Sequence, residues 1–96
     1  MQKDNFKIFI FDNGFVFIAQ EVERKRNRQL GYVRLTECFN IRRWDTGKGL
    51  GSLRNRFGPA NVTLDFEGNT EHRLAKLNYT IELASNHEFN PDDWKN

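Results

Sequence analysis

The sequence has little of what a disulfide-bonded, metal-binding or membrane-spanning protein needs. Its 96 residues include one cysteine, Cys38, so no disulfide can form within the chain. With two histidines, His72 and His87, the usual zinc-ligand spacings cannot be assembled. There is no charged-then-apolar leader at the N-terminus and no apolar run long enough to span a bilayer. We therefore expect a cytoplasmic protein without metal, cofactor or membrane partner.

The sequence also lacks the residue groupings typical of an enzyme. Adjacent carboxylates occur only at Asp92 and Asp93, in a polar tail that is a poor place to hold an acid and a base. Cys38 stands between Glu37 and Phe39 in an apparent strand, with no base nearby in the sequence to activate it. These observations favour a non-enzymatic protein in which Cys38 is a core residue.

The length and charge of the chain fit one small domain with two oppositely charged parts. A domain of 96 residues buries roughly two-thirds of its unfolded surface, and nine phenylalanines supply bulk for a core. Residues 22–56 carry ten basic and three acidic side chains, a balance of +7, whereas residues 65–96 carry three and seven, a balance of −4. This asymmetry is compatible with steering of an anionic partner, with attraction between the two parts, or with contact to a second subunit.

Apolar runs and turn residues in the N-terminal half predict β-strands. Residues 7–11 and 15–18 are rich in β-formers, and Asp12-Asn13-Gly14 between them has hairpin-turn chemistry. The second strand leads into residues 24–28, a basic run that we expect to be a solvated turn.

A third strand follows Gly31 and contains an irregularity. Alternate apolar residues share one parity along it, and Glu37 interrupts the set, which includes Val33, Leu35, Phe39 and Ile41. Either a bulge near Glu37 and Cys38 shifts the register, or the strand bends there.

The remaining elements complete a small β domain. Leu50, Leu53 and Phe57 have helical spacing that predicts one to two turns of helix with Ser52 as cap. Alternation predicts strands over residues 62–66 and 77–83, with a turn at residues 67–69. Together these elements predict a mainly β fold, a small bent antiparallel barrel of the SH3-like or Sm-like kind with one short helix. It spans residues 1–84, followed by an acidic tail over residues 85–96 that is docked or flexible. The alternative is an α+β sandwich with the helix on one face.

Residues 40–54, NIRRWDTGKGLGSLR, have the composition of a binding loop. Glycine at alternate positions leaves backbone N–H groups unshielded and makes positive φ inexpensive, while neighbouring basic side chains supply charge for an anion. The predicted ligand-binding residues are Arg42, Arg43, Trp44, Thr46, Gly47, Lys48, Gly49, Gly51 and Ser52. The structural alternatives are surface ion pairs for the arginines, a core or interface role for Trp44, and a simple connection for the loop.

A second basic group lies at the tip of the second predicted hairpin. Its members, Arg24, Lys25, Arg26 and Arg28, are candidates for contact with phosphate or nucleic acid. The structural alternative is a solvated hairpin tip.

The segments GFVF, GYVRLTECFNIRRW and GKGLGSL resemble a family of short bacteriophage-encoded proteins, in which a strand of the form VRL...C..IRRW leads into a T.KGLG loop. The resemblance covers about residues 15–53 and is most specific at residues 41–44 and 48–51. Residues 45–47, Asp-Thr-Gly, depart from the small residue and two threonines of the family pattern. The resemblance implies an accessory protein acting in the bacterial host cell, and phage proteins of this size are often counter-defence factors or small regulators.

Three functions follow as hypotheses. The favoured one is a binding module that captures a small anionic, nucleotide-like ligand, which in a phage could sequester a host signal. The alternatives are a nucleic-acid-binding small barrel and a protein-binding inhibitor or regulator of a host factor. Unpaired strand edges also predict a homo-oligomer.

Overall fold

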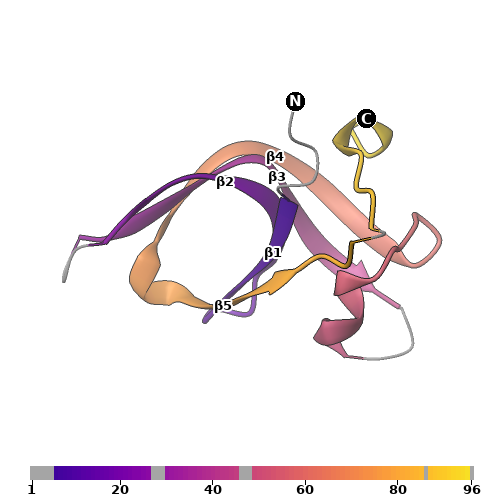
Figure 1. Cartoon of the computed structure of the whole chain (residues 1–96), viewed down its shortest axis with the longest axis horizontal. Coiled ribbons are helices and arrows are strands. Elements are labelled where there is room, and N and C mark those ends of the chain that lie inside the picture. Colours follow the sequence, from indigo (N-terminus) through magenta and orange to yellow (C-terminus); the bar gives the residue numbers. More distant parts are fainter. Residues whose placement is uncertain (1–5, 27–29, 46–48, 86, 96) are drawn as a thin grey trace.

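The computed structural model describes residues 6–26, 30–45, 49–85 and 87–95, which form one antiparallel sheet of five strands (Figure 1). Short 3-10 helices connect or follow the strands. The strands are β1 (Phe6–Phe11), β2 (Val16–Lys25), β3 (Tyr32–Trp44), β4 (Val62–Arg73) and β5 (Leu77–Glu82), and the 3-10 helices are η2 (Leu50–Arg54), η3 (Leu74–Lys76) and η4 (Pro91–Asp93). The prediction of a mainly β protein is confirmed.

The sheet is strongly curved but open. Its strand order is β4-β3-β2-β1-β5, and in Figure 1 β2, β3 and β4 arch over β1 and β5. No ladder joins β4 to β5 within the described parts of the chain, so the curvature does not close the sheet into the predicted barrel. No helix in these parts is long and apolar enough to cross a membrane.

The predicted helix after residue 49 is a single 3-10 segment, η2. Its N-cap is Gly49, which has no side chain to cap with, and Ser52 lies inside the helix. The Ser52 hydroxyl donates a hydrogen bond back to the Gly49 carbonyl over 2.7 Å. Because the described residues contain no α-helix, the alternative α+β sandwich is also wrong.

The hairpin of β1 and β2 forms as its turn residues predict. Gly14 has a φ of 89°, and the Asn13 side-chain oxygen accepts a hydrogen bond from the Phe15 N–H over 3.0 Å. The strands then pair in register, with Phe9 opposite Phe17.

Glu37 forms the predicted irregularity in β3, and it is a bulge. Its φ is 49°, and the pairing of β3 with β4 shifts between Leu35 and Cys38 and again between Cys38 and Phe39. This extra residue turns the later part of β3 over, so that Leu35 and Phe39 face opposite sides of the sheet despite their shared parity.

The middle of the sheet is consequently buried on both faces, which explains why β1 is apolar with little alternation, whereas β4 and β5 are largely half-buried or exposed. The first core cluster consists of Phe6, Ile8, Ile10, Val16, Ile18, Phe39, Ile41, Leu53, Val62 and Phe89. The second core cluster consists of Phe9, Phe11, Phe17, Ala19, Val33, Leu35 and Cys38.

Two predicted turns lie inside strands. Residues 67–69 belong to β4, where Gly68, with a φ of 80°, faces Cys38 across the sheet, and the chain reverses at η3 instead. In the basic run, Arg24 and Lys25 are still part of β2 and pair with Val33 and Tyr32. Both corrections have one cause: pairing with a long β3 extends its neighbours past residues that favour turns.

Candidate functional site

An open groove lies where β2 begins and β3 ends, and it contains part of the predicted ligand-binding set. Its volume is about 520 Å³, and it is lined by Gly14, Phe15, Val16, Asn40, Ile41, Arg42, Trp44 and Asp65. We call it the Trp44 groove. Phe15 follows the β1–β2 hairpin turn directly, and Arg42 and Trp44 belong to the C-terminal end of β3.

Arg42 reaches across to β4 and forms an ion pair in the Trp44 groove. Its guanidinium Nη1 lies 3.1 Å from Asp65 Oδ2, and the two side chains are 63% and 48% exposed. An ion pair this exposed contributes about 0 to 1 kcal/mol. Arg42 therefore gives up little free energy when it exchanges the Asp65 carboxylate for another anion.

Two aromatic side chains give the Trp44 groove its apolar surface. Phe15 is 54% exposed, an unusual position for so large an apolar group, and its ring meets Phe17 edge-on at 6.2 Å. Trp44 is partly buried because it packs against the first core cluster, and it also lines the groove. Trp44 thus combines a packing role with access to the groove.

Arg43, the neighbour of Arg42, is exposed but does not line the Trp44 groove. The pairing of β3 with β4 shifts between Ile41 and Arg43, and consecutive strand residues point to opposite faces. The sequence-predicted pair of arginines is therefore divided, with Arg42 in the groove and Arg43 outside its lining.

The glycine loop is described from residue 49 onward, and Thr46, Gly47 and Lys48 lie outside the described residues. Gly49 has a φ of −71°, and neither Gly49 nor Gly51 uses the positive φ that glycine makes inexpensive. A Cβ atom at either position would meet nothing within 4 Å. Both Ser52 donors, the backbone N–H and the hydroxyl, bond to the Gly49 carbonyl, which leaves neither directed at an anion in this conformation.

The second basic group lies at the other end of β3 from Trp44. Arg24 is held by Glu21 through two contacts, Nε to Oε2 at 3.2 Å and Nη2 to Oε1 at 2.8 Å. Lys25 and Arg26 are exposed, and Arg28 is outside the described residues. Arg24 pairs with Val33, and Arg42 lies nine residues further along β3, roughly 30 Å at 3.3 Å per residue. A mononucleotide cannot touch both sites, whereas a polymer can.

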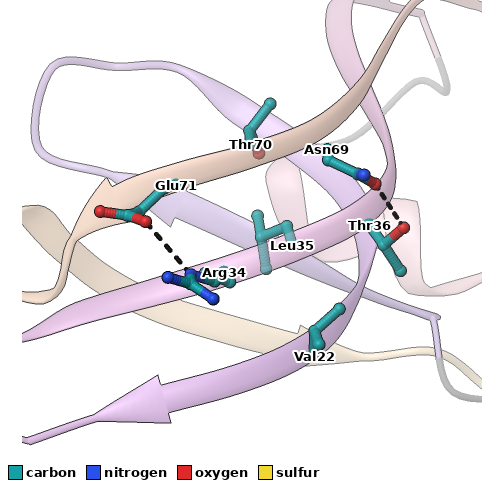
Figure 2. Close-up of a pocket in the computed structure, with 7 residues that line it drawn as sticks. All are labelled: Val22, Arg34, Leu35, Thr36, Asn69, Thr70 and Glu71. Atoms are coloured by element: carbon teal, nitrogen blue, oxygen red, sulfur yellow. Dashed lines mark hydrogen bonds and ion pairs between the residues drawn. The ribbon is translucent and has the colours of Figure 1, made fainter.

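A second open groove crosses β2, β3 and β4 beside the Glu37 bulge (Figure 2), and its polar groups bind one another. Arg34 Nε lies 3.2 Å from Glu71 Oε1, and the Thr36 hydroxyl lies 2.6 Å from the Asn69 amide oxygen. The hydrogen bond to Glu71, with smaller effects of Tyr32 and Glu23, raises the pKa of Arg34. This groove offers a ligand fewer unengaged groups than the Trp44 groove does.

Cys38 has the environment of a core residue. It is fully buried in the second core cluster, and burial raises the pKa of its thiol to about 11. Since the thiolate is the nucleophile, this environment opposes covalent catalysis. Among the described residues, no three His, Cys, Asp or Glu side chains gather as they would around a metal ion.

Sequence reasoning missed Phe15 and Asp65 as site residues. Phe15 follows a hairpin turn directly and alternates with the inward-facing Val16, a pattern that marks it as exposed. Asp65 has no comparable local signal, because its position opposite β3 depends on the register of β4.

Comparisons with models of protein families, with curated proteins and with solved structures found no match.

Proposed function

We propose that the protein is a non-enzymatic binding module that captures a small anionic, nucleotide-like ligand in the Trp44 groove. The observation that carries this proposal is the convergence of Phe15, Trp44 and Arg42 on one open groove of about 520 Å³. Aromatic faces stack on planar rings, and a guanidinium pairs with phosphate. The ligand ring lies against the two aromatic side chains, and its phosphate meets Arg42.

Asp65 sets a condition on the ligand. Its carboxylate lies 3.1 Å from Arg42 Nη1 and puts a negative charge beside the phosphate position that we propose. A phosphate must therefore replace Asp65 as the partner of Arg42, or a ligand N–H or O–H must bind the carboxylate at the same time. Asp65 thereby disfavours simple anions and selects ligands that carry donors as well as charge.

The biological setting that we propose rests on the sequence resemblance to bacteriophage proteins. We propose that the chain is a phage accessory protein that sequesters a host signal nucleotide as a counter-defence factor. The nucleic-acid-binding and protein-inhibitor hypotheses are outcomes of the tests below. The open sheet is proposed to be a variant of the small SH3-like or Sm-like barrel, because β5 returns to pair with β1.

We also propose that the protein is a homo-oligomer. The outer edges of β4 and β5 face no further strand in the described parts of the chain, and such edges tend to pair. Sedimentation equilibrium is expected to give a mass above the 11.4 kDa of one chain, and a monomer at micromolar concentration contradicts the proposal.

The decisive experiment compares two matched arginines. Native mass spectrometry of protein purified from infected cells identifies the retained nucleotide, and calorimetry then measures its affinity for variants. Arg42→Ala and Trp44→Ala are expected to reduce affinity at least tenfold, about 1.4 kcal/mol. Arg34→Ala is the control, because Arg34 is also an exposed β3 arginine paired with a β4 carboxylate, but in the other groove.

The outcomes separate the hypotheses. Equal losses for Arg42→Ala and Arg34→Ala, or none for either, overturn the assignment of the Trp44 groove. Asp65→Asn is expected to raise affinity for inorganic phosphate, since it removes the competing carboxylate. Protein that retains no small molecule and copurifies with a host protein supports the inhibitor hypothesis instead.

A further inference from the structure

Residues 87–95, here called the C-terminal segment, cover part of the first core cluster. The Phe89 ring meets Phe6 edge-on at 4.9 Å and Phe39 at 5.5 Å, and Phe89 is 4% exposed. Trp94 stacks on Phe89 at 6.2 Å. The described residues of the segment belong to no strand. The segment is held to the sheet by these aromatic contacts and by the ion pair of Lys95 with Glu37 of β3, 2.7 Å long.

His87 begins this segment and is buried in it as if it were apolar. The residue is 8% exposed, and its ring meets Phe57 edge-on at 4.9 Å. Neither Nδ1 nor Nε2 has a hydrogen-bond partner among the described residues. A neutral imidazole in this position pays a desolvation cost of about 1 to 3 kcal/mol, and an imidazolium would pay more because nothing accepts its protons.

The charged groups around His87 come from two segments. Arg56 approaches from the chain after η2, and Glu88 and Asp93 belong to the C-terminal segment itself. Together with His87 they line two adjoining cavities of about 520 and 400 Å³. The two carboxylates line these cavities without reaching a ring nitrogen, while the guanidinium adds positive charge beside the ring.

The surroundings of His87 lower its pKa below the ordinary value of 6.5. Burial is the larger cause, and the positive charge of Arg56 is the smaller one. The backbone of His87 itself raises the pKa by a smaller amount, although it does not form a hydrogen bond with either ring nitrogen. When the segment leaves the sheet, the imidazole regains water and its ordinary pKa, so the released form binds protons more readily than the docked form.

We propose that His87 makes the docking of the C-terminal segment pH-sensitive, holding it to the sheet as a neutral ring and releasing it when the ring is protonated. Docking is fully favoured above about pH 6.5 and is lost as the pH falls below that value toward the lower pKa of the docked state. One titrating group increases the release equilibrium by at most tenfold per pH unit. Release uncovers the aromatic rings of Phe6, Phe39 and Phe57, a surface suited to apolar contact.

Hydrogen exchange of the full-length protein tests this proposal. Mass spectrometry follows the peptide that contains residues 87–95 between about pH 7.5 and about pH 5.5, with rates corrected for the intrinsic effect of pH. The opening equilibrium of this peptide is expected to rise by up to about tenfold per pH unit below about 6.5. Peptides from β1 and β2 are expected to change less, because they remain in the sheet.

Two variants separate His87 from general acid sensitivity. His87→Phe replaces the ring with one that cannot titrate and is expected to make the opening of the segment independent of pH. His72→Phe is the matched control, since His72 packs against Phe11 and Phe17 in the other cluster, and it is expected to retain the wild-type dependence.

Because His87→Phe can perturb packing, the wild-type protein provides a second measurement. The NMR titration of the His87 ring is expected to give a midpoint below 6.5 that coincides with a change in the Trp94 indole signal. A segment that stays equally protected to about pH 5.5, or a pH dependence that persists unchanged in His87→Phe, overturns the proposal. The first outcome would mean that Glu88 or Asp93 turns to accept the proton within the docked segment.

Discussion

The Lys95 ammonium lies 2.7 Å from the Glu37 carboxylate, which ties the C-terminal segment to the bulge of β3. Lys95 also lies over the Phe66 ring, 4.7 Å from its centre. Glu37 is the one non-glycine residue of the described parts that has a positive φ. The strained position and the docked segment are therefore neighbours.

Replacement of Glu37 separates backbone strain from the ion pair. Glu37→Gly and Glu37→Ala both lose the carboxylate, but only glycine adopts a φ of 49° without steric cost. We expect Glu37→Gly to be more stable than Glu37→Ala by about 1 kcal/mol in urea unfolding. Lys95→Gln is the control for the ion pair alone. Equal stability of the glycine and alanine variants would show that the bulge carries no strain.

Gly68 is expected to be intolerant of a side chain for a conformational reason. Its φ is 80°, and a Cβ atom would lie 3.9 Å from the nearest Phe66 ring atom, an ordinary contact. Gly68→Ala should therefore cost about 1 to 2 kcal/mol of unfolding free energy through its backbone. Gly51→Ala is the matched control, because a Cβ there meets nothing and φ is not positive, and its effect should be within about 0.5 kcal/mol.

The buried thiol of Cys38 is expected to make the folded protein less stable in alkali. Burial raises the thiol pKa from 9.0 to about 11, so the folded state holds the proton more tightly than the unfolded state. This contribution is fully present below about pH 9, is lost as the pH rises toward 11, and amounts to roughly 2 to 3 kcal/mol. Urea unfolding across that range measures it. Cys38→Val removes the thiol, and the same alkaline loss in that variant would assign it to other groups.

Salt dependence distinguishes a mononucleotide site from a nucleic-acid surface. Binding of a single strand loses affinity with a log–log slope of about −0.7 per phosphate neutralised, so a polymer gives a steep slope and a mononucleotide a shallow one. We expect a shallow slope that is unchanged when the second basic group, Arg24, Lys25, Arg26 and Arg28, is replaced by serine. A steep slope on single-stranded RNA that flattens in this variant would establish nucleic-acid binding instead.

Local sequence patterns predicted the structure correctly wherever it depends on residues that are neighbours in the chain. The β1–β2 hairpin follows from Asn13 and Gly14, because the side chain of one and the positive φ of the other build the turn directly. Glu37 also marked its own bulge, since a charged residue broke the apolar alternation of β3. Gly68 was misread because positive φ serves a bulge as well as a turn, and only pairing with β3 keeps the strand going.

The candidate site likewise has some residues that the sequence could predict and others that depend on strand pairing. Arg42 and Trp44 belong to one strand end and could be selected from composition. Their partners come from elsewhere: Phe15 arrives through the pairing of β2 with β3, and Asp65 through the pairing of β3 with β4. Composition had grouped Arg43 with Arg42, and the alternation of side chains along β3 directs the two to opposite faces.

The sequence by itself determined the β character of the chain, the first turn and the place where β3 is irregular, because these depend on φ preferences and alternation over a few residues. The tertiary structure decided that β5 pairs with β1, that the sheet stays open, and that the middle of the sheet is buried on both faces. It also decided that the His87 ring lies near Arg56 and that its nitrogens have no hydrogen-bond partner among the described residues. These features depend on strand register and on contacts between distant segments, and no local pattern encodes either of them.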